Sequence, residues 1–246
     1  MTLSNSFRSA RFEFRMRVAS DPRLRMLYWP VVRWGQHKIR QAGHIDPREA
    51  EVLPDTELVI DGFQGSANSY LTRAFKHAQP EPVRLAHHLH AAVGVLRAAD
   101  LQIPTLVTIR EPEGAALSLV SRWPYVSLAQ ALRSYVRYYE VIESVAASVV
   151  ICPFVITTRH PNLAIEAVNE RFGTSFVVFE PTEENVRTVR GLTSQKKAKA
   201  EARKRVRAQK AVELNDPEAQ HWLARAQVVY ARMLAYAPES LAVHVP

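Results

Sequence analysis

The feature that most constrains the fold is an alternation of short apolar runs with segments of helical periodicity, which begins at residue 56. We expect strands at 56–63, 83–90, 104–110 and 148–154, and helices at 69–78, 113–122, 127–146 and a further one that Gly173 closes. Strands that alternate with helices favour a mostly parallel sheet with helices on both faces. The sequence therefore predicts an α/β fold of three layers.

The segments on either side of this core differ from it. We expect a helical lead-in at residues 1–54, the core at 55–191, and a basic helical segment packed on the core at 192–246. A chain of 246 residues suits one large α/β domain with such additions rather than two complete domains. Residues 221–237 have the apolar spacing of an amphipathic helix that packs on the domain.

Two basic stretches leave alternatives open. Residues 24–34 mix large apolar side chains with arginines, which suits either a helix packed on the domain or a helix in a membrane interface. Residues 196–210 carry eight basic residues and one acidic residue, which suits a solvated helix face or a contact for phosphate or nucleic acid. The net charge of +8 favours an anionic partner without choosing its kind.

The cellular location is inferred from segments that the sequence lacks. Cys152 is the single cysteine, which excludes an internal disulfide framework and fits a reducing compartment. No run approaches the ~20 apolar residues that cross a bilayer, and the arginine-rich N-terminus lacks the apolar stretch of a secretory signal. We expect a cytoplasmic protein whose basic N-terminal helix is able to contact an acidic membrane surface.

Directly after the first expected strand, residues 62–69 read GFQGSANS, where a phosphate-binding loop would turn from strand to helix. In the register of the pattern G-x4-G-K-[ST], Gly62 and Ser69 remain, while Ala67 and Asn68 replace the second glycine and the lysine. Such a loop aims backbone N–H groups and a helix N-terminus at phosphate oxygens. Without the lysine and a strand that carries a metal-holding aspartate, magnesium-dependent hydrolysis of ATP or GTP is disfavoured.

The same loop resembles the first motif of the sulfotransferase family, F-P-[KR]-S-G-[TN]-[TS], with matches at Phe63, Ser66, Asn68 and Ser69. The family's second motif is a strand that ends in an arginine, with a serine eight residues later. Arg110 and Ser118 stand at that interval. The resemblance runs from about residue 56 to 180 and is nearest to bacterial sulfotransferase-like proteins with the loop F-P-R-S-A-N-T followed by H-H-L-H.

This resemblance implies a P-loop-type fold that binds 3′-phosphoadenosine 5′-phosphosulfate without a metal. The sulfuryl group would pass to a hydroxyl or amine of a small-molecule or carbohydrate acceptor. Arg110 and Ser118 would bind the 3′-phosphate, and a guanidinium suits a phosphate dianion because its donors form a fork. Arg110 also follows the carboxyl end of a strand, where open α/β sheets bind ligands. The alternative for Arg110 is a surface ion pair with Glu111 or Glu113.

His88 stands twenty-two residues before Arg110, the interval at which cytosolic sulfotransferases have their catalytic histidine, so the resemblance makes His88 the general base. A histidine with an ordinary pKa of about 6.5 suits that role because it accepts a proton at neutral pH. Two alternatives stay open: a structural histidine, and a metal site with His87 and His90. Adjacent strand residues point to opposite faces and no carboxylate or cysteine lies close by in the sequence, which disfavours the metal site.

Further positions are implied by the resemblance alone. Tyr70 stands where the family often has a tryptophan against the adenine, although a core aromatic explains it equally well. Arg190 and Gly191 are similar to the family's C-terminal phosphate loop, Arg-Lys-Gly. The 5′-phosphosulfate would be bound by the loop residues Gln64, Gly65, Ser66, Ala67, Asn68 and Ser69.

Two positions depart from the family. Gly65 replaces a lysine or arginine that neutralises charge as the sulfuryl group leaves, and Gln64 replaces a proline. Losing one such electrostatic contact typically lowers turnover ~10²- to 10³-fold. Either Arg73, Arg110 or the 196–210 segment supplies the cation, or the chain is a catalytically weak nucleotide-binding module that contacts a polyanion or a membrane. A third alternative is a nucleic-acid binder without a nucleotide site, although no nucleic-acid partner is expected for a sulfotransferase.

Overall fold

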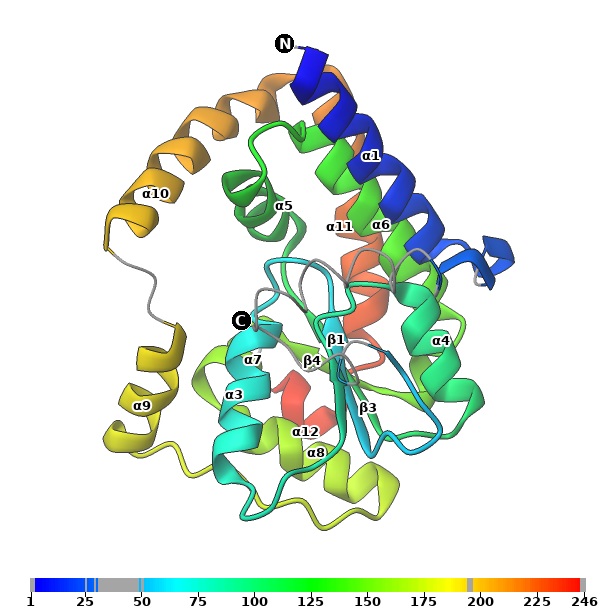
Figure 1. Cartoon of the computed structure of the whole chain (residues 1–246), viewed down its shortest axis with the longest axis vertical. Helices are drawn as coiled ribbons and strands as arrows, with labels where there is room; N and C mark the ends of the chain where they lie inside the picture. The colour runs from blue at the N-terminus through cyan, green and yellow to red at the C-terminus, as the bar shows by residue number, and fades with distance from the viewer. Residues whose placement is uncertain are drawn as a thin grey trace.

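A computed structural model describes residues 3–24, 26–28, 30, 49, 51–193 and 197–243 of the chain. In this part of the chain, four parallel strands form a sheet in the order β2-β1-β3-β4 (Figure 1). The strands are β1 (Leu58–Gly62), β2 (Leu85–His87), β3 (Thr105–Ile109) and β4 (Val150–Pro153). All four expected strands are present. The second is shorter than expected because His88 and His90 both have positive φ, which ends the extended backbone.

Helices cover both faces of the sheet. One face packs against α4 (Ala92–Asp100), α6 (Leu128–Glu143) and α11 (Pro217–Leu234). The other face packs against α3 (Asn68–Ala78), α7 (Phe154–Arg159), α8 (Pro161–Phe172) and α12 (Glu239–Ala242). Both faces are covered because apolar side chains of a strand alternate between the two faces of the sheet. In β3, Leu106 packs in the core on the α3 side, and the next residue, Val107, packs in the core on the α6 side. The chain therefore has the α/β fold with a parallel sheet that the alternation predicts.

Several helix ends follow local sequence signals. Ser127 and Gln130 form a reciprocal capping box at the start of α6. Asp216 caps α11 by accepting hydrogen bonds from two backbone N–H groups, and Pro217 occupies the first turn. Gly173 ends α8 with a φ of +63°, as expected from the sequence. The last amphipathic helix thus begins four residues earlier than its apolar pattern indicates, at the Asp-Pro signal.

The remaining elements frame the carboxyl end of the sheet or connect the larger helices. They are α1 (Leu3–Ser20), α5 (Pro112–Arg122), α9 (Glu183–Thr193), α10 (Lys197–Ala211) and the 3₁₀ turns Pro22–Leu24, Ala146–Ser148 and Val212–Asn215. Helix α10 contains most of the expected basic segment and packs on α5, while α9 runs along α3 (Figure 1).

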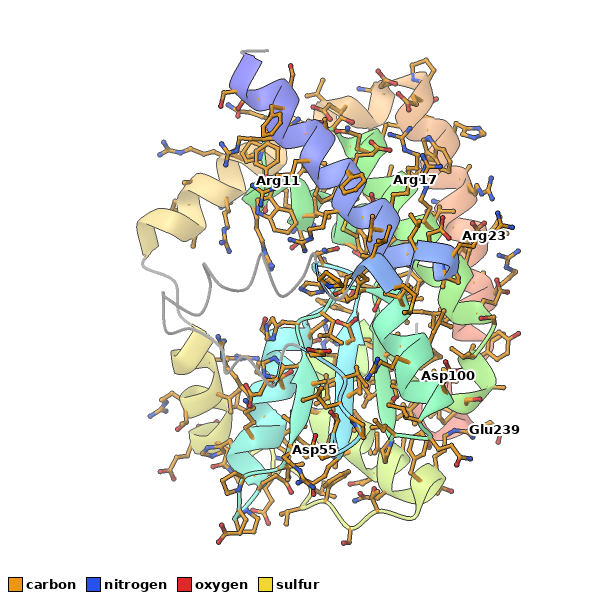
Figure 2. All side chains as sticks on the ribbon, turned by 45° about the vertical axis from the view of Figure 1, so that its right-hand side comes forward. Arg11, Arg17, Arg23, Asp55, Asp100 and Glu239 are labelled. Atoms are coloured by element: carbon orange, nitrogen blue, oxygen red, sulfur yellow. The ribbon has the colours of Figure 1, made fainter. Side chains whose placement is uncertain are left out.

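The N-terminal helix packs on the domain through one face only. Phe12 and Met16 of α1 are buried in the core that also includes α6, and Glu13 forms an ion pair with Arg133 at 2.6 Å. Arginines line the N-terminal segment (Figure 2). Most of the 24–34 segment, with its two alternatives, lies outside the described residues. Among the helices in the described ranges, none combines the length and apolar character required to cross a bilayer.

Candidate functional site

The turn from β1 into α3 is the loop that the sequence singles out. Gly65 and Ala67 have φ angles of +95° and +67°, and α3 begins at Asn68. In the described ranges, the N–H groups of Ala67, Asn68 and Ser69 donate to no protein acceptor. A helix N-terminus with N–H groups that lack partners attracts anions, because the helix dipole adds to the local positive charge. The loop therefore has the backbone geometry for an anion.

The Asn68 side chain holds this loop against the neighbouring strand. Its Nδ2 donates to the Gly62 carbonyl oxygen at 2.9 Å, and its Oδ1 accepts from the Thr108 hydroxyl at 2.6 Å. A Cβ at residue 62 would come within 2.2 Å of Thr108 Oγ1, so this close approach requires glycine. The Asn68 side chain thus positions the loop, a role that the sequence pattern does not indicate.

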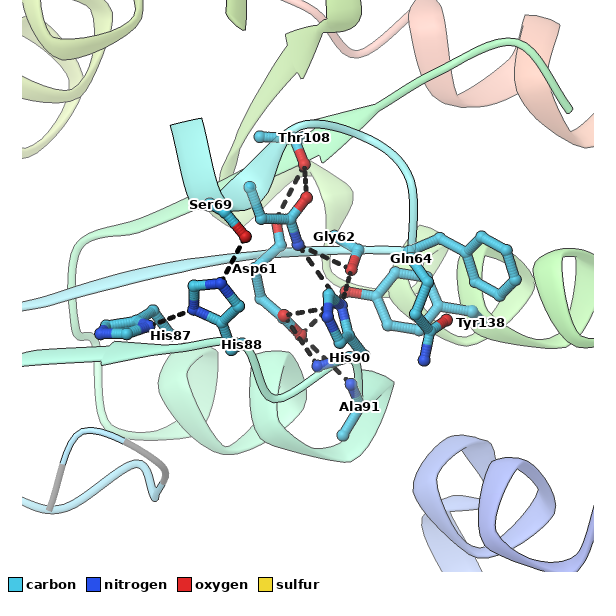
Figure 3. Close-up of polar contacts among 12 residues, drawn as sticks. Asp61, Gly62, Gln64, Ser69, His87, His88, His90, Ala91, Thr108 and Tyr138 are labelled. Carbon is cyan, nitrogen blue, oxygen red and sulfur yellow. Dashed lines mark hydrogen bonds and ion pairs between the residues drawn. The ribbon is translucent and has the colours of Figure 1, made fainter. Parts of the chain in front are cut away.

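Asp61 is a fully buried carboxyl group next to the loop that our sequence analysis missed. It accepts hydrogen bonds from the N–H of His90 at 2.9 Å, the N–H of Ala91 at 3.2 Å and the Tyr138 hydroxyl at 3.0 Å (Figure 3). Burial raises the pKa of Asp61 to about 6, and the hydrogen bonds oppose the rise. The available signal was an acidic residue inside an otherwise apolar strand, LVIDGF at 58–63. Asp61 anchors the turn that carries the histidines.

His88 lies beside the loop. Its Nε2 is 2.5 Å from Ser69 Oγ in the first turn of α3. Its Nδ1 contacts Nδ1 of His87, and His87 Nε2 lies 3.0 Å from Glu49 Oε2. Burial, followed by the charges of His87 and His90, lowers the pKa of His88 to about 3. This pKa lies well below the ordinary histidine value of about 6.5, so His88 is neutral at pH 7 and is a weaker base than an unperturbed histidine.

His90 supports the loop from the same turn. Its Nδ1 lies 2.8 Å from the Gly62 carbonyl oxygen, which only accepts hydrogen bonds, so Nδ1 carries the proton. Burial is the main cause that lowers the pKa of His90 to about 4, and Arg15 and Arg122 lower it further. His90 is thus a structural histidine that holds the carboxyl end of β1.

Arg110 and Ser118 meet the loop at Gly65. Arg110 Nη1 donates to the Gly65 carbonyl oxygen at 3.3 Å, and a Cβ at residue 65 would lie 2.9 Å from Ser118 Cβ. Arg110 also forms the ion pair with Glu111 that the sequence left open, with 3.1 Å between Nε and Oε2. Its guanidinium lies 4.2 Å from the centroid of the Phe154 ring. A cation therefore reaches Gly65 although residue 65 itself carries no charge.

Two other loop side chains are buried in the protein. Gln64 is 1% exposed and its Nε2 lies 3.6 Å from Met16 Sδ of α1. The Ser66 hydroxyl is fully buried next to Tyr139, and no described residue provides a hydrogen bond of ordinary geometry. Both side chains are therefore turned into the protein interior, and the Ser66 N–H donates to the Phe63 carbonyl oxygen at 3.2 Å.

The remaining expected positions lie on α3 and α9. Tyr70 packs with Phe179 and Val189, so the alternative of a core aromatic describes its surroundings. Arg190 and Gly191 are exposed in the last two turns of α9, where the resemblance implies a loop. Val189 packs in one cluster with Ala74 of α3, so Arg190 lies on a helix that contacts the same α3 that begins at the loop of residues 62–69.

Arginines from several helices act on the histidines beside the loop. The charges of Arg15 in α1 and Arg122 in α5 lower the pKa of His90. The charge of Arg73 in α3 lowers the pKa of His88. The charge of Arg203 in α10 lowers the pKa of Arg122. Within the described ranges, none of these four arginines forms an ion pair with a carboxylate. Cations from three helices therefore act on the histidines beside the loop, and Arg203 adds positive charge near Arg122, which favours an anionic ligand.

The metal alternative gains no support from the histidines. Glu49, which lies thirty-eight residues from His87 in the sequence, does approach it in space. Among the described residues, however, no group of three or more histidine, cysteine, aspartate or glutamate side chains is arranged to hold a metal ion.

Comparison with known proteins identifies no relative. No protein family, no curated protein and no solved structure matches this chain. The residues of the site and their geometry are therefore the basis for any functional conclusion.

Proposed function

We propose that this protein binds 3′-phosphoadenosine 5′-phosphosulfate at the loop of residues 62–69 and transfers its sulfuryl group to a hydroxyl or amine acceptor. The observation that carries the proposal is the convergence of His88, Arg110 and Ser118 on this loop. His88 belongs to one segment and Arg110 and Ser118 to another, and both are separate from the loop in sequence. His88 and Arg110 each form a hydrogen bond with a loop residue, and Ser118 lies where it would meet a Cβ on Gly65. A resemblance in spacing alone does not require that convergence.

The geometry supports a division of roles. The N–H groups of Ala67, Asn68 and Ser69, which have no acceptor among the described residues, would bind the 5′-phosphosulfate, and Arg110 would supply the charge that Gly65 lacks. As the acceptor oxygen or nitrogen bonds to sulfur, its proton passes to Nε2 of neutral His88. The bond from sulfur to the bridging oxygen breaks, and adenosine 3′,5′-bisphosphate leaves. In this proposal Arg110 and the backbone N–H groups would stabilise the developing charge, so the transfer would not require a metal.

A second candidate is a nucleotide-binding module with little catalytic activity. Two observations favour it, namely the absence of a cation on residue 65 and the low pKa of His88, which makes a weak base. Both candidates predict binding of the nucleotide, and they differ only in turnover.

Binding is tested by thermal unfolding and calorimetry with adenosine 3′,5′-bisphosphate. This nucleotide should raise the melting temperature, whereas ATP with magnesium should have little effect, because a ligand that binds only the native state stabilises it. The variant Arg110→Ala should lose at least ~1.5 kcal/mol of binding free energy, about tenfold in affinity. Arg84→Ala is the matched control, since Arg84 pairs with Glu57 at 3.3 Å at the start of β2. A larger shift with ATP and magnesium, or equal losses in the two variants, would refute the proposal.

Turnover separates the two candidates. Release of adenosine 3′,5′-bisphosphate is followed with a panel of phenols, amines and sugars. If His88 is the base, His88→Ala should lower turnover by ~10²-fold or more and leave nucleotide affinity near wild type. Nucleotide binding without turnover for every acceptor would instead identify the binding module.

A further inference from the structure

Four side chains form a continuous line of polar contacts beside the loop. Ser69 Oγ lies 2.5 Å from His88 Nε2, and the Nδ1 atoms of His88 and His87 are in contact (Figure 3). His87 Nε2 lies 3.0 Å from Glu49 Oε2, and the other oxygen of Glu49 accepts from Lys76 Nζ at 2.5 Å. The line thus connects the first turn of α3 to a carboxylate that is itself held by α3.

The chemistry of the end group determines the position of every proton along this line. A carboxylate only accepts, so His87 donates from Nε2 to Glu49 and, being neutral, has no proton on Nδ1. The contact between the two Nδ1 atoms then requires the proton to lie on His88 Nδ1. His88 Nε2 is consequently unprotonated and accepts from the Ser69 hydroxyl. Each step permits one tautomer only.

We propose that Glu49 and His87 are positioning residues that fix the tautomer of His88, so that its Nε2 remains unprotonated and faces the phosphate-binding loop. The consequence for catalysis rests on the proposed function, but the tautomer itself does not. The arrangement follows a general pattern in which a base is oriented by a second group on its far side. Here an imidazole and a carboxylate in series provide that second group.

The surroundings of the histidines keep them neutral. The His87 side chain is only 6% exposed, and burial lowers its pKa, as do the charges of Lys76 and Arg73. Glu49 is the group that opposes this shift. His88 experiences the same two cations together with His90. Neutral imidazoles are required for the proton assignment, because a doubly protonated ring would donate from both nitrogens.

The assignment also links the base to ligand binding. The Ser69 hydroxyl has a single hydrogen, which is donated to His88 when no anion is present. An anion bound at the start of α3 would compete for that hydrogen. Once Ser69 donates to the anion instead, His88 Nε2 loses its partner and is able to accept the proton of an acceptor substrate. Binding of the sulfuryl donor would therefore precede exposure of the base.

The tautomer is measured by ¹⁵N–¹H correlation spectra of the full-length protein labelled at histidine, without nucleotide. We expect wild-type His88 to carry its proton on Nδ1 and to have an unprotonated Nε2. Glu49→Ala should convert His88 to a mixture of tautomers, whereas Glu49→Gln should retain the wild-type tautomer, because its amide oxygen still accepts from His87. Glu57→Ala is the control, since the Glu57 carboxylate is engaged by Arg84.

Each outcome decides the proposal. A proton on His88 Nε2 in the wild-type protein overturns it even if a variant fails to fold. An unchanged His88 spectrum in both Glu49→Ala and His87→Leu overturns it as well. If turnover is detected, Glu49→Ala should lower kcat by no more than the ~10²-fold loss expected for His88→Ala, with nucleotide affinity unchanged. Failure of nucleotide binding would remove the proposed function and leave the tautomer result standing.

Discussion

Replacing Gly65 by alanine should destabilise the protein more than the same change at another glycine with positive φ. Gly65 has a φ of +95°, which alanine adopts only at a cost. In addition, its Cβ would lie 2.9 Å from the Ala115 carbonyl oxygen and 2.9 Å from Ser118 Cβ. The helix α5 backbone is not free to move away, because α5 packs against α6 and α10. Both the conformation and the contact therefore oppose a side chain here.

The magnitude is the sum of two contributions. A residue with a Cβ in the left-handed region costs about 1–2 kcal/mol. Extra atoms in a close-packed region cost about 1–3 kcal/mol more. The expected loss of unfolding free energy is thus about 2–5 kcal/mol. At about 2–4 °C per kcal/mol for a chain of this size, the melting temperature should fall by about 4–20 °C.

Two control variants separate the contributions. Gly173→Ala has a φ of +63° with open space around its Cβ, so it should lose only the conformational part, about 1–2 kcal/mol. Gly191→Ala lies within α9 and also meets open space, so it should gain about 0.5–1 kcal/mol. Urea unfolding followed by circular dichroism measures all three variants. Equal losses at Gly65 and Gly173 would refute the close contact with Ser118. The same strain predicts that Gly65→Arg does not restore turnover.

Two further predictions concern acid stability and membranes. His90 has a pKa of about 4 in the folded protein, whereas an ordinary histidine has a pKa of about 6.5. Below pH 6.5 the unfolded chain therefore binds this proton before the folded protein does, and the free energy of unfolding decreases as the pH is lowered. When the pH is lowered from 7 to 5, the free energy of unfolding of His90→Asn, measured in urea, should therefore decrease by about 2 kcal/mol less than that of the wild type. The same pH dependence in both proteins would contradict this prediction. On α1, Phe7 and Phe14 are 71% and 61% exposed on the face that also carries Arg11, which suits an anionic lipid surface. The double variant Phe7→Ser/Phe14→Ser should co-sediment several-fold less with anionic vesicles. The control Val228→Ser replaces another exposed residue and should leave vesicle binding unchanged. Equal binding of the wild-type protein to anionic and uncharged vesicles would argue against a surface for anionic lipids.

The sequence alone determined the order of the strands and helices along the chain and the location of the loop. Buried strands are short apolar runs and amphipathic helices repeat every few residues, so both are visible over a window of about ten residues. The signals for Gly173 as a helix end and for residues 62–69 as a turn from strand to helix are equally local. The spacing of Arg110 and Ser118 likewise survives in the structure as a shared contact with Gly65.

The environment of each group in the site was decided only by the tertiary structure. Glu49 lies thirty-eight residues from His87 in sequence, and nothing local indicates their contact. The low pKa of His88 arises from burial between elements that the sheet order brings together, and the buried Asp61 depends on Tyr138, seventy-seven residues away, for a hydrogen bond. The lack of room for a side chain at Gly65 is likewise a result of the approach of α5. Secondary structure depends on near neighbours along the chain, whereas pKa values, tautomers and close contacts depend on neighbours in space, which the packing of the sheet and helices determines.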